Sequence, residues 1–154
     1  MTGPGAAGQA FPAVARDEAS AEFFAAAARG ELLMQRCPAS GDVLGPQART
    51  CPSCGSDDLD PVVVSGRGTL VSWAVVHQAP VPSLAAAVPY LTAVVELAEG
   101  PWLLVRLAGA EGGDGLEPRV GLPLVACFLP SGAAGDEPAG EMLPAFMPLA
   151  QATS

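Results

Sequence analysis

The sequence contains no lysine, and its seven basic residues are all arginines. Sixteen aspartate and glutamate residues leave a formal net charge of -9 at pH 7. A surface of this sign repels the phosphates of nucleic acids and the head groups of anionic membranes. We therefore exclude free nucleic acid as a partner, and the charge is of the kind that keeps a protein in solution.

Long apolar runs are also missing. No stretch approaches the roughly 20 apolar residues that a membrane-spanning helix requires. The opening residues MTGPGAAGQAFPAVARD lack the basic and apolar regions of a signal peptide. We expect a cytoplasmic protein without a membrane span. In that reducing compartment, clustered cysteines are more often metal ligands or redox groups than structural disulfides.

Residues that commonly catalyse reactions are scarce. The single histidine, His77, follows an apolar run with no acid or nucleophile beside it in sequence, which favours packing or hydrogen bonding over catalysis. Phosphate-binding glycine loops are absent, because SGRG at residues 65–68 is too short to count as one. The aromatic residues Trp73, Tyr90 and Trp102 are interpreted as core or interface anchors, since base stacking would also need a basic groove. We assign no catalytic residues and expect no activity from the chain alone.

Apolar residues, in contrast, are abundant. Half of the 154 residues are hydrophobic and only 15% are charged. A chain of this length is expected to form one ordinary domain with a small appendage, and to bury about two thirds of its unfolded surface. One small core does not use all of these apolar residues, so we expect apolar surface to remain for a partner.

The stretch DEASAEFFAAAARG has the signals of a helix at both ends. Asp17 is the expected N-cap, acidic residues follow in the first turn, and Arg29 and Gly30 mark the end. The adjacent Phe23 and Phe24 widen the apolar face. Packing on the chain's own domain and docking on another subunit both explain these two side chains.

From residue 61 onward the pattern changes to short β-rich runs. They are bounded by glycine, proline or acidic turn residues, and read PVVVSGRGTLVSWAVVH, PYLTAVVEL, PWLLVRLAG and RVGLPLVACFL. Four or five strands in about 90 residues favour a closed or partly closed antiparallel barrel, because closure removes exposed edges. EGP at residues 99–101 predicts a tight hairpin.

The cysteines outline a small metal site with one ligand missing. ELLMQR predicts a short strand that leads into Cys37, and CPSCG at residues 51–55 has the form of a zinc knuckle. Cys37 lies at the spacing of a facing knuckle, in which Ser40 stands where a fourth cysteine is expected. Gly41 follows Ser40 as Gly55 follows Cys54.

The pattern leaves three interpretations of this site. The favoured one is a zinc ion held by Cys37, Cys51 and Cys54, with the fourth position taken by water, by the Asp42 carboxylate or by a deprotonated Ser40. The alternatives are a metal-free ribbon maintained by packing and a Cys51–Cys54 disulfide or redox pair. Cys127 lies in LVACFL, which predicts a small buried hydrophobe.

The order of these features resembles the DUF35 family. The motifs are the Phe-rich helix, GELLMQRC, the knuckles, SGRGTLVSWAVVH, VPYLTAVVELAEGPWLLVRL and the closing LPAFMP, which together cover roughly residues 20–148. The resemblance implies a mainly β fold in which an N-terminal helix and a rubredoxin-like zinc ribbon precede an antiparallel OB-fold barrel. We expect a flexible arm at 1–14, the helical region at 15–30, the ribbon at 31–60, the OB-fold at 61–148 and a tail at 149–154. Ser40 is the departure from the family pattern.

The resemblance also implies a function. Members of this family are accessory subunits of thiolase-superfamily enzymes that act on acyl-CoA, including acyltransferases and lipid-transfer-protein-like aldolases that degrade steroid side chains. Some associate with MaoC-like hydratases, and the catalytic residues belong to the thiolase-like partner. We therefore expect a non-catalytic subunit that supports assembly of the complex and handling of CoA substrates. The alternatives are a CoA-binding or zinc-dependent enzyme acting alone, and a general OB-fold interaction module.

The partner interface is expected to be apolar. The uncharged segment VPSLAAAVPY and the helix around the paired phenylalanines suit a protein surface better than water. We predict that the interface includes Phe23, Phe24, Val81, Leu84 and Tyr90.

Overall fold

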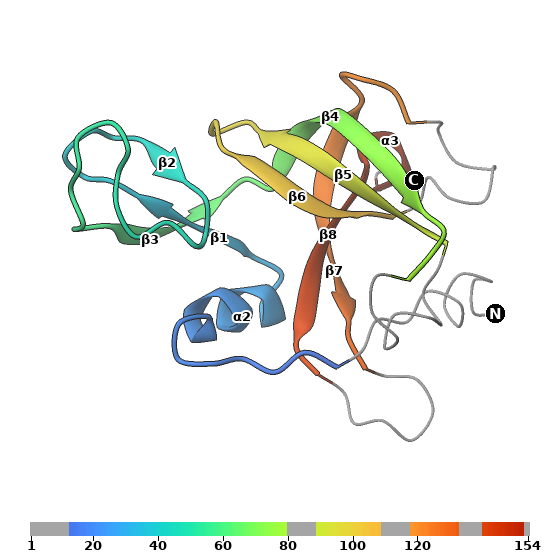
Figure 1. Ribbon diagram of the computed structural model, residues 1–154, viewed down its shortest axis with the longest axis horizontal. Helices are drawn as coiled ribbons and strands as arrows, with labels where there is room; N and C mark the ends of the chain where they lie inside the picture. The colour runs from blue at the N-terminus through green and yellow to red at the C-terminus, as the bar shows by residue number, and fades with distance from the viewer. Residues whose placement is uncertain (1–12, 80–88, 109–117, 133–139, 153–154) are drawn as a thin grey trace.

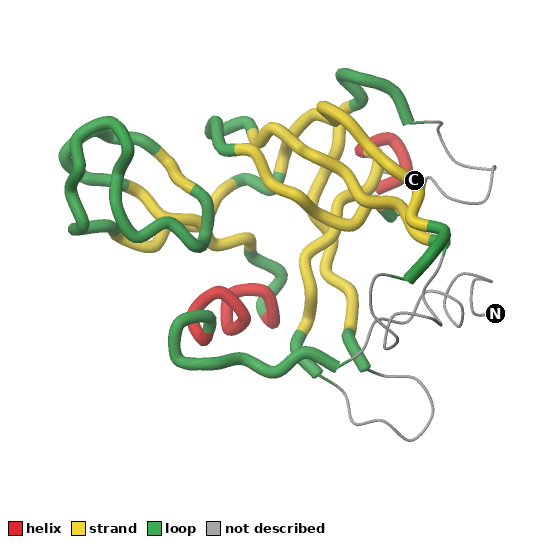
Figure 2. Tube along the Cα trace, viewed as in Figure 1, coloured by secondary structure: helices red, strands yellow, loops and turns green. Residues whose placement is uncertain are grey.

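The computed structural model describes residues 13–79, 89–108, 118–132 and 140–152 of the chain. Figures 1 and 2 show three parts: a short helix, a small ribbon sheet and a barrel of strands. The mainly β fold expected from the sequence is confirmed, including the order of helix, ribbon and barrel.

Helix α2 spans Ala21–Ala28, and so it begins three residues later than the expected N-cap implies. The N-cap is Ser20; the prediction of Asp17 was wrong. The Asp17 carboxylate instead accepts hydrogen bonds from the backbone N–H and the hydroxyl of Ser20, at 2.9 and 2.6 Å, and closes a separate turn before the helix. Among the described residues, neither helix has the length and apolar character that crossing a bilayer demands.

The ribbon sheet contains three antiparallel strands in the order β2-β1-β3. Strand β1 (Leu32–Arg36) is the strand predicted at ELLMQR, and it pairs with β2 (Val43–Leu44) and β3 (Asp60–Val64). Side chains alternate along β1, so Leu32 and Met34 are buried on one face. This face turns towards the barrel.

The barrel is closed by five strands in the order β4-β5-β6-β8-β7. They are β4 (Arg67–Val76), β5 (Tyr90–Leu97), β6 (Trp102–Leu107), β7 (Pro123–Pro130) and β8 (Met142–Pro148), followed by helix α3 (Leu149–Ala152). Four pairings are antiparallel, as expected, and the β6–β8 pairing is parallel. A ring with an odd number of strands cannot alternate direction throughout, so one parallel pair is unavoidable.

One hydrophobic core joins the ribbon to the barrel. Leu32 and Met34 of β1 belong to the same buried cluster as the inward side chains of the barrel strands, among them Val95, Leu107 and Phe146. Phe23 of helix α2 packs against this cluster. The ribbon and the helix therefore have fixed positions against the barrel through shared apolar burial.

The SGRG segment (residues 65–68) and the EGP turn (residues 99–101) meet where the ribbon leads into the barrel. The backbone N–H of Ser65 donates to the Glu99 carboxylate at 2.9 Å, and the N–H of Ala126 donates to the Gly66 carbonyl at 2.7 Å. The EGP hairpin, confirmed as the β5–β6 turn, thus holds the segment that connects β3 to β4. Gly68 approaches strand β5 so closely that a Cβ atom there would lie 2.7 Å from the Glu96 carbonyl oxygen.

A second connection ties the segment before helix α2 to the β7–β8 hairpin. The backbone of Val14 donates to the buried Ser131 hydroxyl at 3.0 Å and accepts from the N–H of Glu141 at 2.7 Å. The Arg16 guanidinium binds both carboxylate oxygens of Glu141, at 2.7 and 2.9 Å, and this hydrogen bonding lowers the pKa of Glu141. This connection holds the helix to the end of the β7–β8 hairpin. It lies on the side of the barrel opposite to the ribbon linker, the segment that connects β3 to β4 (Figure 1).

Replacing Gly68 with alanine tests the close contact of β4 with β5. The added methyl group has no space beside Glu96, so we expect the variant to lose about 1–3 kcal/mol of unfolding free energy through overpacking. Denaturant unfolding measures this difference. Gly45→Ala is the matched control, because a Cβ atom at Gly45 meets nothing within 4 Å and should leave stability nearly unchanged.

Candidate functional site

Three cysteines come together at the end of the ribbon away from the barrel core. Cys37, Cys51 and Cys54 place their sulfur atoms within 4.8 Å of one another. Cys37 and Cys51 are buried, whereas Cys54 is exposed. The sulfur atoms of Cys37 and Cys54 are 3.6 Å apart, close to the roughly 3.8 Å that two thiolates adopt on one tetrahedral zinc ion.

The two knuckles have the same backbone hydrogen bonds. In the first, the N–H of Gly41 donates to the Cys37 carbonyl at 2.7 Å, and the N–H of Cys37 donates to the Asp42 carbonyl at 2.9 Å. In the second, the N–H of Gly55 donates to the Cys51 carbonyl at 2.7 Å, and the N–H of Cys51 donates to the Ser56 carbonyl at 2.8 Å. Ser40 is therefore the structural equivalent of Cys54.

Each knuckle closes with a glycine in the left-handed region. Gly41 has a φ of 81° and Gly55 a φ of 76°, a conformation that costs other residues energy. The repeated CPxx-Gly pattern in the sequence is thus a repeated three-dimensional turn. The two turns differ in sequence at their third and fourth residues, which are Ala39 and Ser40 in the first and Ser53 and Cys54 in the second.

The Ser40 hydroxyl faces the cluster, and the Asp42 carboxylate does not belong to it. Ser40 Oγ lies 3.3 Å from the sulfur of Cys51. The Asp42 carboxylate instead accepts a hydrogen bond from the Ser53 hydroxyl at 2.7 Å, outside the group of thiols. Of the side chains considered for the fourth position, the geometry favours Ser40.

The pKa values of two thiols respond to this arrangement. The hydrogen bond from Ser40 lowers the pKa of Cys51 to about 7, although desolvation opposes the change. For Cys54, a backbone hydrogen bond from Ser56 lowers the pKa, but the contact with Cys37 and desolvation outweigh it and the pKa is raised. The thiolate is the form that binds metal, and Cys51, with the lowered pKa, is the more easily deprotonated thiol of this pair.

The donor set fits a metal ion better than a disulfide. Among the described residues Cys51 and Cys54 are both free thiols, so the structure does not contain the disulfide between them that was considered as an alternative. Three soft thiol donors within 4.8 Å form a metal-binding site of the kind that selects zinc. Cys127 is half-buried on β7, rather than fully buried as expected, and is not a member of this cluster.

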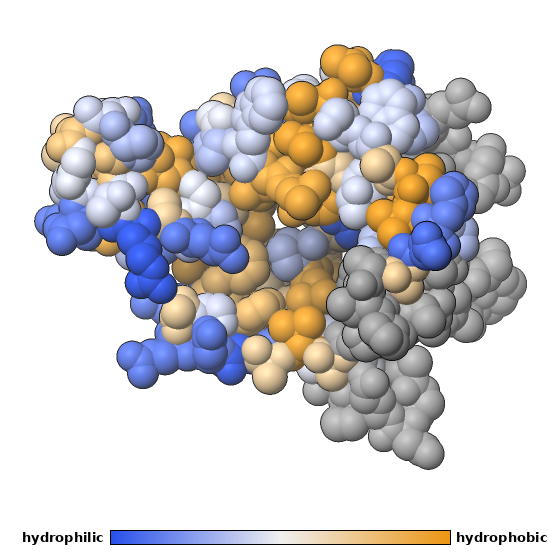
Figure 3. All heavy atoms as spheres, in the orientation of Figure 1, coloured by the Kyte–Doolittle hydropathy of each residue, from blue (hydrophilic) through white to orange (hydrophobic). Residues whose placement is uncertain are grey.

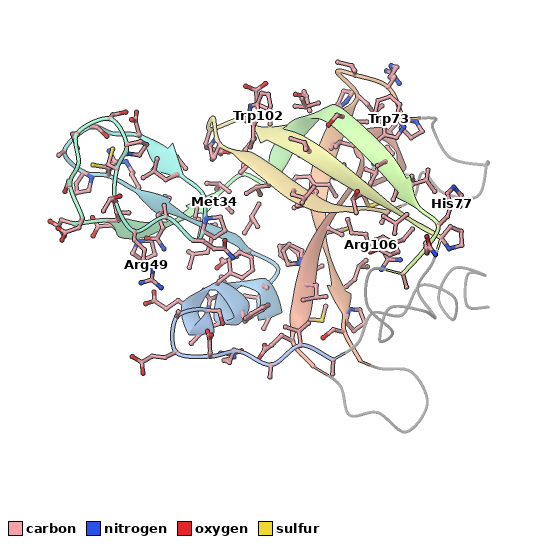
Figure 4. The ribbon with its side chains drawn as sticks, in the orientation of Figure 1. Met34, Arg49, Trp73, His77, Trp102 and Arg106 are labelled. Atoms are coloured by element: carbon pink, nitrogen blue, oxygen red, sulfur yellow. The ribbon has the colours of Figure 1, made fainter. Side chains whose placement is uncertain are left out.

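A groove lies where the helix, the ribbon and the barrel meet. It encloses about 340 Å³. Apolar side chains dominate its walls, and they come from all three parts, including Phe23, Met34, Leu104 and Leu143. Figure 3 shows apolar surface around this hollow, and Figure 4 shows Met34 on the ribbon side of it. A wider, more polar groove adjoins it and is lined by Phe24, Gln35 and Arg49.

The residues predicted for the partner interface fall in different places. Phe23 and Phe24 are half-buried, with ring centroids 5.4 Å apart, and both line the grooves. Tyr90 begins β5 and is buried. Val81 and Leu84 lie outside the described residues. His77 is exposed just after β4, at the end of the barrel away from the ribbon (Figure 4).

Sequence reasoning named Trp102 as a core or interface anchor, but it missed the exposed Leu104 on the same strand β6. Trp102 and Leu104 are exposed to 59% and 77%, although both are large and apolar. The run WLLVRL carries no alternation of apolar and polar residues over its first four positions, so its outward face could not be recognised from sequence. The available signal for an exposed apolar face was the uninterrupted apolar run itself, because a strand of a small barrel has one face outside the core.

Two family models match consecutive parts of the chain. The model for the ChsH2 rubredoxin-like zinc ribbon domain matches residues 24–60, and the model for the ChsH2 C-terminal OB-fold domain matches residues 61–129. The chain belongs to the DUF35 family. Its three-cysteine cluster is thus part of a zinc ribbon, and the ribbon model together with the three thiols supports zinc as the bound metal.

Relatives of this DUF35 chain carry two kinds of name. A "Probable enoyl-CoA hydratase alpha subunit" from Thermomonospora curvata is 40% identical over 77% of this chain, and a 3-oxo-4,17-pregnadiene-20-carboxyl-CoA hydratase alpha subunit from Mycobacterium tuberculosis is 35% identical over 77%. A DUF35 domain-containing scaffold protein from Pyrococcus furiosus is 35% identical over 47% of this chain. The chain spans 35% of the length of either hydratase subunit and 52% of the scaffold protein.

A solved structure matches most of the DUF35 chain. In the Ltp2-ChsH2(DUF35) aldolase, a chain with 37% sequence identity superposes with a TM-score of 0.65. The match covers 89% of this chain and 98% of that chain. The shared fold therefore extends over nearly the whole length of a chain that was solved as part of an aldolase.

Replacing Ser40 with cysteine tests the fourth position of the metal site. We propose Cys37, Cys51 and Cys54 as ligands of one zinc ion, so Ser40→Cys should supply the missing thiolate. Affinity should rise roughly a hundredfold, because a structural site with four ligands is worth about 10–16 kcal/mol and each ligand contributes a share. Competition with a chromophoric chelator measures this affinity.

Two further variants control this experiment. Ser53→Cys adds a thiol in the facing knuckle, at an exposed position whose hydroxyl donates to the Asp42 carboxylate, and should not tighten binding. Cys51→Ala should lower the zinc content measured by elemental analysis. Equal zinc content in wild type and Cys51→Ala would show that the cluster does not hold the ion.

Proposed function

We propose that this chain is a non-catalytic accessory subunit of a thiolase-superfamily enzyme that acts on acyl-CoA, most closely a lipid-transfer-protein-like aldolase. The observation that carries the proposal is the match to a chain of the Ltp2-ChsH2(DUF35) aldolase over 98% of that chain at 37% identity. The role proposed is to support assembly of the complex and handling of its CoA substrate.

Few side chains among the described residues are placed as catalysis would require. His77 is exposed at a strand end, and the three clustered thiols are used as a metal site rather than placed in a cleft with a base. The narrower groove beside helix α2 is lined mainly by apolar side chains, and the wider one combines Phe23 and Phe24 with polar and charged side chains such as Arg49. A surface of this composition is suited to contact with another protein.

A hydratase complex is the second candidate. Two relatives are named as α subunits of CoA-ester hydratases, and both match over 118 residues of this chain. The M. tuberculosis relative is named for a steroid-derived acyl-CoA, which supports a steroid side-chain substrate for the complex in which this chain works. A MaoC-like hydratase is the partner that this alternative requires.

Reconstitution separates the two candidates. The chain, a lipid-transfer-protein-like subunit and a MaoC-like subunit are purified singly and in pairs, and each is assayed for retro-aldol cleavage and for hydration of steroid-derived acyl-CoA. We expect no turnover by the chain alone and aldolase activity from its pair with the lipid-transfer-protein-like subunit. Full activity of that subunit by itself, or turnover by the isolated chain, would overturn the proposal.

The proposed interface includes helix α2 at Phe23 and Phe24. Phe23 also packs against the core, whereas Phe24 lines the wider groove, so Phe24 is the better position for a variant. Because Tyr90 is buried, we propose that it fixes the start of β5 rather than touching the partner. Val81 and Leu84, which adjoin it in sequence, remain part of the proposed interface.

Phe24→Asp should separate the two subunits without unfolding the barrel. An unpaired charge in a desolvated interface costs several kcal/mol, on the order of 3–5, which weakens binding by at least a hundredfold. Ala28→Asp is the matched control, because it adds the same charge to an exposed position of the same helix. Size-exclusion chromatography and calorimetry compare the variants, and equal weakening by both would place the interface elsewhere.

A further inference from the structure

Strand β6 is paired along one edge and largely unpaired along the other. All six of its residues face β5, whereas only Arg106 and Leu107 face β8. In the part of the chain that the structure describes, no strand lies beside residues 102–105 on the side away from β5. Figure 1 shows β8 turning away from β6 below this point, towards helix α2. The barrel therefore has an open edge at residues 102–105.

The hydrogen bonds at the two ends of β6 show which backbone groups face this open edge. Pro101 accepts from the N–H of Leu97 at 2.9 Å, so residues 101, 103 and 105 direct their backbone groups towards β5. At the other end, the N–H of Ala108 donates to the Phe146 carbonyl at 2.7 Å, so the alternate residues face β8. It follows that the N–H and C=O groups of Trp102 and Leu104 point to the open side, where the described residues supply no partner.

This edge lacks the features that usually protect one. Exposed edge strands commonly carry charged residues, proline or a bulge, which prevent pairing with another chain. Residues 102–105 are Trp-Leu-Leu-Val, and the two residues with unpaired backbone groups are also the exposed apolar ones. An unprotected apolar edge of this kind is a template for a further strand.

The apolar groove runs along the same edge. Its lining includes four consecutive residues of β6, 103–106, whose side chains alternate between the two faces of the strand. A groove over one face would be lined by every second residue, so this groove follows the edge itself. Its opposite wall consists of apolar side chains of the helix, the ribbon and β8, including Phe23, Leu32 and Pro144.

We propose that an extended, uncharged segment of the enzyme subunit pairs with this edge of β6. Its backbone would bond to the N–H and C=O groups of Trp102 and Leu104, and its alternate apolar side chains would occupy the groove. A helix in the groove would leave these backbone groups unpaired. A second copy of this chain is disfavoured because its own β6 edge lies in the same kind of recess, and two concave surfaces do not fit each other. The inference rests on the proposed function, since it assigns the surface through which that partner is held.

Two variants at Leu104 separate backbone pairing from side-chain contact. Leu104→Ala removes the exposed side chain and keeps the N–H, whereas Leu104→Pro removes the N–H as well. Because this N–H points away from β5, the proline does not break the β5–β6 ladder, and proline is tolerated at such edge positions. Binding to the purified lipid-transfer-protein-like subunit should be about tenfold or more weaker for Leu104→Pro than for Leu104→Ala, because the partner's acceptor is left unpaired.

Amide hydrogen exchange of the wild-type chain tests the same point without a variant. The amides of Trp102 and Leu104 should exchange rapidly in the free chain and slowly in the complex. Thermal unfolding and zinc content of Leu104→Pro, unchanged from wild type, confirm that the barrel and ribbon are intact.

The outcomes distinguish this inference from the proposed function. A complex that forms with equal affinity for both Leu104 variants, or with the two amides still exchanging rapidly, would overturn the edge pairing and leave the accessory role standing. Failure of the wild-type chain to bind the enzyme subunit would overturn both. Protection of the same amides at high concentration of the chain alone would identify a second copy as the occupant, and would also overturn the proposal.

Discussion

The burial of β1 against the barrel is the contact on which the arrangement of the molecule depends. Leu32 and Met34 lie in one continuous core with the barrel strands, although they belong to the ribbon sheet. A three-stranded ribbon of this size buries too little apolar surface to be stable by itself, so it takes its stability from the barrel at one end and from the cysteine cluster at the other. Helix α2 is held in the same way, because Phe23 packs on this core.

Two polar connections also hold the ribbon linker and the segment before helix α2 to the barrel. The carboxylate of Glu99 holds the linker between ribbon and barrel, and the Arg16–Glu141 pair holds the segment before the helix. The apolar groove lies between these two connections, with walls from every part of the fold. Its shape therefore depends on how the ribbon, the helix and the barrel pack together.

The sequence predicted the parts of this structure that local patterns determine. The strand before Cys37, the knuckles and the EGP hairpin each carry their signal in a few adjacent residues, and all lie where expected. The start of the helix was predicted wrongly because Asp17 and Ser20 are both good capping residues, and only the bonds between them decide which one caps the helix.

Features that depend on distant parts of the chain could not be predicted in this way. The parallel β6–β8 pair and the open edge at Leu104 both follow from how the barrel closes, and no short motif encodes closure. The groove is a further example, because its lining residues range from Phe23 to Pro144. Surplus apolar composition indicated that such a surface exists, but not where it lies.

The position of the cysteine cluster argues for a structural role of its metal. A catalytic zinc site keeps one coordination position open to water or substrate, usually beside a cleft. Here two of the three cysteines are buried, and the Ser40 hydroxyl stands at the place that a fourth ligand would occupy. Strand β1 ends at Arg36, immediately before Cys37, while its other end at Leu32 enters the core. A metal at the knuckles would thus hold one end of the strand whose other end forms a wall of the groove, and it would act through the position of β1 rather than through chemistry.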